Sequence, residues 1–109
     1  RIGDTDPIVL RDRQKLANDG MVTIVATMSQ KHKRIEGVEL SARGVSFTID
    51  DEFTADATDA ILKMVEKGSF NFTSSGTDAL RKAVRDSISN FIWNRPKTRP
   101  MIIPVVMEV

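Results

Sequence analysis

Residues 95–109 read RPKTRPMIIPVVMEV, and this C-terminal stretch decides how the rest of the chain is interpreted. Three basic residues with no acid among them, Arg95, Lys97 and Arg99, lead into an apolar run that contains Pro104. Chain ends are usually polar and frayed, whereas this run would be mostly apolar on both faces of a strand. Proline cannot donate to a β-ladder, which favours an edge strand or a bulge. The stretch therefore predicts a final strand whose second face needs a cover.

The composition indicates one soluble globular domain of 109 residues, with 40% apolar and 28% charged residues and a net charge of +1. A net charge this small does not indicate nucleic-acid binding by the whole surface, so any such contact must be local. The absence of cysteine excludes a disulfide framework, and the single histidine, His32, cannot form a histidine metal cluster by itself. No apolar run approaches the ~20 residues of a membrane span, and we expect no membrane partner.

The first half of the chain is predicted to form a short helix and two strands. Residues 11–20, RDRQKLANDG, contain good helix formers and end at a glycine that can close a helix. Residues 21–30, MVTIVATMSQ, form a strand pattern that places the even-numbered residues from Val22 to Met28 toward the core. The polar segment KHKRIEG, residues 31–37, suits a hairpin connection to the second strand.

The second strand, VELSARGVSFTI at residues 38–49, changes its apolar phase at Arg43 and Gly44. An extra residue in a β-bulge would return the apolar side chains to one face, and glycine supplies the unusual backbone angles. The bulge would be either a structural kink or a device that aims Arg43 at a ligand or a neighbouring domain.

Two helices are predicted next, because apolar residues recur at helical spacing. The first covers residues 51–67, and the second starts near Ser75 or Thr77 and ends at Pro96. Ser75 and Asp78 fit a capping box at the start of the second helix. Trp93, near its end, would either anchor the helix to the sheet or stack on a ligand.

These elements predict an α+β fold, a small three-stranded sheet with two α-helices packed on one face, plus a short N-terminal helix. Two helices cover only one face of such a sheet, and an exposed apolar sheet face usually marks an interaction surface. We therefore predict packing onto a second copy or another domain. The predicted interface residues are Met101, Ile103, Val105 and Met107 of the final strand, with Met21 and Val25 of the first.

No motif in the chain predicts catalysis, a metal site or a cofactor. The glycines form no phosphate-binding loop, and His32 lies in a charged hairpin where a solvated side chain is the ordinary state. The acids of residues 50–59 resemble a weak cation site but are better explained as charges that complement a helix dipole. A local basic group could contact RNA phosphates, with solvated charge as the alternative. Its members are Arg43, Arg95, Lys97 and Arg99.

Three stretches carry a resemblance to a known family: IVLRDRQKLANDGMVTIV (residues 8–25), LSARGV (residues 40–45) and RPMIIPVVMEV (residues 99–109). In this order and spacing they resemble the C-terminal domain of bacterial ribonuclease J, and the last stretch is the most specific. ARGV stands where Ser-Arg-Gly-Phe is more usual. The leading IGD resembles the end of the linker that precedes this domain, which assigns residues 1–9 to an entry segment and residues 10–109 to the domain.

The resemblance implies a parent enzyme with a two-zinc metallo-β-lactamase domain and an inserted β-CASP domain. Such enzymes digest RNA from 5′ to 3′, also cut internally, and act in messenger decay and ribosomal RNA maturation in the bacterial cytoplasm. Zinc ligands and catalytic residues would belong to those other domains. The family's C-terminal domain is associated with subunit assembly and full activity. The expected partners are therefore a second copy and the parent's catalytic domains, with RNA binding as the alternative.

Overall fold

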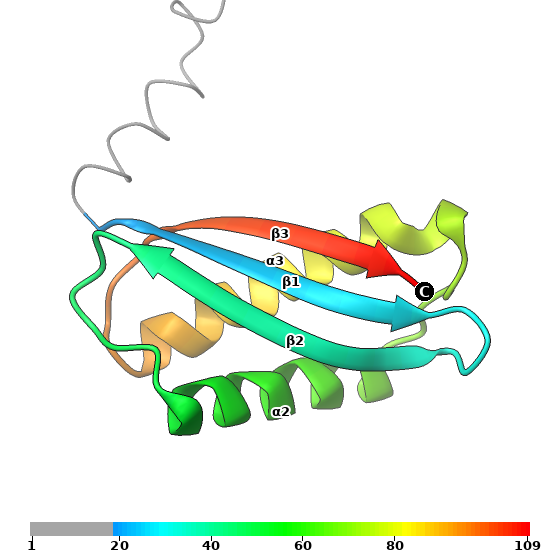
Figure 1. The fold of residues 1–109 in the computed structure, drawn as a ribbon, viewed down its shortest axis with the longest axis horizontal. Coiled ribbons are helices and arrows are strands. Elements are labelled where there is room, and N and C mark those ends of the chain that lie inside the picture. The colour runs from blue at the N-terminus through cyan, green and yellow to red at the C-terminus, as the bar shows by residue number, and fades with distance from the viewer. Residues whose placement is uncertain (1–18) are drawn as a thin grey trace, which may run out of the picture.

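A computed structural model describes residues 19–109, so that the entry segment and all but the last two residues of the predicted N-terminal helix lie outside the described part. The three strands form one sheet in the order β2-β1-β3, with β2 antiparallel and β3 parallel to the central β1. Both α-helices lie on one face of this sheet (Figure 1), which confirms the predicted α+β fold. The elements are β1 (Met21–Ser29), β2 (Arg34–Arg43), α2 (Asp51–Lys67), the 3-10 helix η2 (Ser74–Gly76), α3 (Thr77–Asn94) and β3 (Met101–Glu108).

The core lies between the helices and the central strand. Every second residue of β1, from Val22 to Met28, is completely buried, which confirms the face predicted for this strand. Burial of each large apolar side chain contributes roughly 1.5–3 kcal/mol, so this layer supplies most of the drive for folding. The completely buried residues of the helices are Ala57 and Ile61 in α2, and Leu80, Val84, Ile88 and Ile92 in α3.

Two glycines meet where β1 begins and β2 ends. Gly20 has a φ of 86° and Gly44 a φ of 68°, backbone angles that residues other than glycine rarely adopt. A Cβ atom on Gly20 would lie 2.5 Å from the carbonyl oxygen of Arg43. Only glycine fits this approach, and the approach fixes how the two strands align.

The turn and the irregularity of the hairpin lie elsewhere than predicted. The turn occupies residues 30–33, with Lys33 at a φ of 54°, so residues 34–37 belong to β2 and not to the connection. The register shift falls between Thr27 and Met28 of β1. The predicted bulge at Arg43 and Gly44 is therefore wrong. The apolar phase changes there because β2 ends at Arg43, and the following apolar residues pack on the core from an irregular segment.

A side chain caps α2 at its start, whereas none caps α3. Asp50 accepts a hydrogen bond from the Phe53 N–H at 2.8 Å through Oδ1 and so caps α2. No side chain caps α3, because η2 leads directly into it and Gly76 occupies the cap position. The predicted capping box is wrong, and the Ser75 hydroxyl instead lies 2.9 Å from the hydroxyl of Thr73.

Candidate interaction surface

Alternate residues of the three strands form the face of the sheet that α2 and α3 do not cover. Residues paired across neighbouring strands point to the same side, so the register places them in four rows. We call these twelve residues the open face. Its rows are Arg43–Met21–Met101, Ser41–Thr23–Ile103, Glu39–Val25–Val105 and Gly37–Thr27–Met107.

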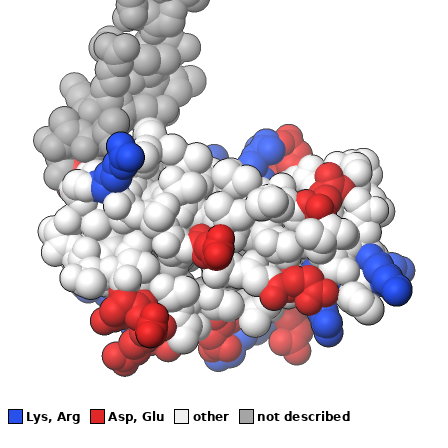
Figure 2. Space-filling view, viewed as in Figure 1, with Lys and Arg blue, Asp and Glu red and all other residues white. Residues whose placement is uncertain are grey.

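The structure brings all six residues of the predicted interface together on the open face. Val105 and Met107 are 37% and 53% exposed, and the other four are partly buried by their neighbours in the sheet. In Figure 2, where the sheet faces the viewer, this side of the molecule is largely uncharged and most charged side chains lie around its rim. The open face is apolar along β3 and polar along β2.

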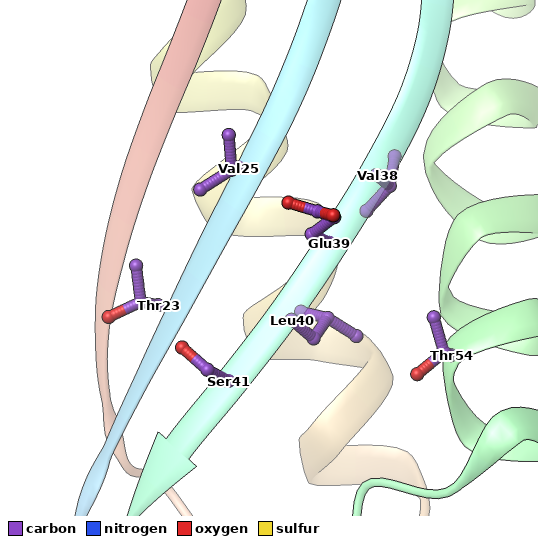
Figure 3. Close-up of a pocket in the computed structure, with 7 residues that line it drawn as sticks. All are labelled: Thr23, Val25, Val38, Glu39, Leu40, Ser41 and Thr54. Atoms are coloured by element: carbon purple, nitrogen blue, oxygen red, sulfur yellow. The ribbon is translucent and has the colours of Figure 1, made fainter.

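The polar side of the open face borders a shallow hollow of about 360 Å³. The Glu39 side chain points from β2 toward Val25 of β1, with Ser41 and Thr23 beside it (Figure 3). Within residues 19–109, neither Glu39 nor Arg43 forms an ion pair. The hollow is lined by Thr23, Val25, Val38, Glu39, Leu40, Ser41 and Thr54.

Sequence reasoning did not select Glu39 or Ser41 for this surface. The signal was present, because both alternate with Val38, Leu40 and Ala42 and so point away from the helices. Their neighbours across the sheet could not be named from the pattern. The register depends on the turn at residues 30–33 and on the shift beside Thr27, and neither position was predicted.

Pro104 lies in β3, which is an edge strand of the sheet, as its missing N–H predicts. The N–H groups of Met101 and Val109 donate to the carbonyl oxygens of Gly20, just before β1, and of Met28 in β1, at 2.9 Å each. Since N–H groups of alternate residues point to the same side of a strand, the Pro104 nitrogen faces the free edge of β3. Pro104 therefore costs no bond to β1 and interrupts the row of donors that another strand would use.

The four predicted RNA-contacting residues lie near one end of the sheet, but they differ in their surroundings. Arg95 forms an ion pair with Asp56 at 2.8 Å and stacks on the ring of Phe91. The backbone N–H of Arg99 donates to Asp19 at 3.0 Å, close to the row that holds Arg43. Lys97 is exposed in the connection from α3 to β3, at a φ of 62°. The structure thus groups these residues loosely.

Trp93 does not anchor α3 to the sheet. Its side chain is 40% exposed, and the Arg99 guanidinium lies 4.3 Å from the ring centroid. The neighbouring Ile92 is completely buried and belongs to the core cluster that also contains the inward-facing residues of β1. The prediction is wrong because one residue rotates a helix position by about 100°, which moves Trp93 out of the apolar stripe.

Three acids of the segment 50–59 have local partners. Asp50 is a helix cap, Asp56 pairs with Arg95, and Asp59 pairs with Lys63 at 3.0 Å. Across residues 19–109, no three His, Asp or Glu side chains gather as a metal site requires. Within the same range, neither α2 nor α3 combines the length and the apolar character of a membrane-crossing helix.

The sheet, the two helices and the open face define a small α+β domain. The model of the family described as Ribonuclease J C-terminal domain matches residues 8–109, and the chain belongs to this family. It is similar to Ribonuclease J2 of Bacillus subtilis, with 33% identity over 99% of this chain. It is 36% identical to Ribonuclease J 2 of Staphylococcus epidermidis and of Staphylococcus aureus over the same share. The chain spans about a fifth of the length of these relatives, 20% in each case.

Proposed function

We propose that this chain is a non-catalytic domain of a ribonuclease J-type enzyme, and that its open face mediates subunit assembly and thereby supports activity. The observation that carries the proposal is the gathering of six apolar side chains on the face opposite the helices. Apolar area of this kind is a common mark of a protein-protein contact. The contact would be made with a second copy, with the parent's catalytic domains as the other expected partner.

Association through the open face would be driven by burial of the β3 side chains. Val105 and Met107 keep 37% and 53% of their surface exposed, so that docking has apolar area left to remove from water. Complete burial of such a side chain is worth roughly 1.5–3 kcal/mol, from which the cost of association is subtracted. A handful of these anchors is enough for a contact that responds to concentration.

The parent would supply the chemistry. The names of the relatives support a ribonuclease, and the resemblance implies a zinc-dependent enzyme that acts as a 5′–3′ exonuclease and endonuclease. Its zinc would be held by the metallo-β-lactamase domain, outside this chain. Its substrates would be messenger and ribosomal precursor RNA in the cytoplasm.

Sedimentation equilibrium of the chain, from low to high micromolar concentration, tests the proposed assembly. We expect a concentration-dependent dimer that Val105→Asp weakens by at least about tenfold, because the substitution places a charge in an apolar contact. Leu62→Asp is a matched control, since Leu62 is 41% exposed on α2, away from the open face. A strictly monomeric chain, or equal effects of the two substitutions, would contradict the proposal.

A second candidate function is guidance of RNA along the basic end of the sheet. The supporting observation is that Arg43 and Lys97 are exposed and form no ion pair within residues 19–109. Binding of single-stranded RNA should then decrease steeply with salt, and Lys97→Glu should weaken it. Lys82→Glu on α3, also exposed, is the control. An absence of binding at low salt would remove this candidate.

A further inference from the structure

We propose that two copies stack their open faces about a two-fold axis that crosses the strands at the row Ser41–Thr23–Ile103. This inference rests on the self-association proposed above, and it names the partner and its register. The register is inferred from the positions of the only two charged side chains of the open face, Glu39 and Arg43. They lie on the same strand, each two residues from Ser41, on opposite sides of it.

The axis of such a dimer lies between the two sheets. When it runs across the strands, each strand lies over its own copy in the opposite direction. Positions along the strand are then exchanged about the axis. With the axis at Ser41, Glu39 lies over Arg43 of the second copy, and Arg43 lies over Glu39 of that copy. This exchange is the self-complementarity that a two-fold contact requires.

The same operation matches the apolar residues of the open face. Met21 lies over Val25 of the second copy, Met101 lies over Val105, and Ile103 lies over its own equivalent. No apolar side chain of these three rows is placed against a charge. Arg34 and Glu36, near the hairpin turn, pair with each other at 3.4 Å and lie too far along β2 to take part.

Three other two-fold arrangements fail on charge. An axis along the strands would place β2 over β3, so that Glu39 would face Val105 and Arg43 would face Met101. Burial of a charge against apolar groups is costly. An axis across the strands at the row of Glu39 or of Arg43 would set like charges face to face. Of these four arrangements, the charge pattern thus selects the one with the axis at Ser41.

Charge reversal in the full chain tests the register by sedimentation equilibrium. Glu39→Arg places Arg over Arg, and Arg43→Glu places Glu over Glu, so each should raise the dimer Kd by at least about tenfold. The double variant restores both pairs and should return the Kd to within about threefold of the unsubstituted chain. Glu66→Arg, an exposed change of the same sign on α2, should leave the Kd unchanged. Circular dichroism of each variant verifies folding.

Cross-linking gives a second, independent measurement, because the chain contains no cysteine. Ile103 lies in the row that the axis crosses, so the two thiols of an Ile103→Cys dimer would face each other across the spacing of about 10 Å between stacked sheets. A short bismaleimide can bridge this distance. Met107→Cys lies four residues from the axis, so its two copies would be about 26 Å apart along the strands. We expect dimeric product from Ile103→Cys alone.

The outcomes separate this inference from the proposed function. A monomeric unsubstituted chain overturns the self-association itself, and docking onto another domain of the parent would then remain for the open face. A dimer that Val105→Asp weakens, but that neither charge reversal affects, keeps the face-to-face contact and overturns the register. Cross-linking through Met107→Cys as readily as through Ile103→Cys also overturns it. Rescue by the double variant supports it.

Discussion

The Met101 N–H donates a hydrogen bond to the Gly20 carbonyl oxygen at 2.9 Å, which ties the start of β3 to the start of β1. The same glycine approaches the backbone of Arg43 and Gly44 at the end of β2. One residue thus fixes the alignment of all three strands at the end of the sheet where the row Arg43–Met21–Met101 lies.

Gly20→Ala should destabilise the domain. Its φ of 86° and a Cβ only 2.5 Å from the Arg43 carbonyl oxygen combine strain with a clash, so we expect a loss of at least about 1–3 kcal/mol in the free energy of unfolding. Urea unfolding followed by circular dichroism measures this loss. Gly37→Ala is the control, since no atom lies within 4 Å of its added Cβ, and it should change stability by less than about 0.5 kcal/mol. Similar losses of stability for Gly20→Ala and Gly37→Ala would contradict the requirement for glycine at position 20.

Replacement of Ile92 by alanine should reduce folding stability more than replacement of Trp93, although tryptophan is the larger residue. Ile92→Ala removes a completely buried side chain and should cost about 2–5 kcal/mol of folding stability. Trp93→Ala removes an exposed ring and one stacking contact with Arg99, worth about 0.5–1 kcal/mol. Thermal unfolding of the two variants gives the comparison. A larger loss for Trp93→Ala would restore the anchoring role that the sequence suggested.

The two helix starts should respond differently to loss of a side-chain oxygen. Asp50→Ala removes the hydrogen bond to the Phe53 N–H and should lower stability by about 0.5–2 kcal/mol. Ser75→Ala removes a hydroxyl that caps no helix, so its effect should stay within about 0.5 kcal/mol. Equal losses in chemical denaturation would mean that Ser75 caps α3 after all.

The sequence predicts those parts of this fold that depend on local periodicity. The bounds of α2, the buried face of β1 and the edge position of Pro104 all follow from spacing and from the chemistry of single residues. The errors concern relations between segments. The phase change at Gly44 can mean a bulge or the end of a strand, and only the contact between Gly20 and Gly44 decides between them.

For the open face too, local patterns are predictable from the sequence, whereas relations between strands are not. Its apolar members could be found one strand at a time, because Met101 to Met107 and Met21 to Val25 each follow an alternation of two. The positions of Glu39 and Arg43 relative to those residues depend on the register of the sheet. That register is set by a four-residue turn and by a shift in pairing that no local pattern marks.

The free edge of β3 is the subject of the last prediction. Pro104→Val restores an N–H that points away from β1, so the free energy of unfolding should change by less than about 1 kcal/mol. Val105→Pro instead removes an N–H directed at β1 and leaves a carbonyl oxygen unpaired, at a cost of about 1–3 kcal/mol. Pro104→Val also completes the row of outward donors, so we expect more light scattering on prolonged incubation as chains pair edge to edge. Unchanged scattering, or a greater loss of stability from Pro104→Val than from Val105→Pro, would show that Pro104 does not protect this edge.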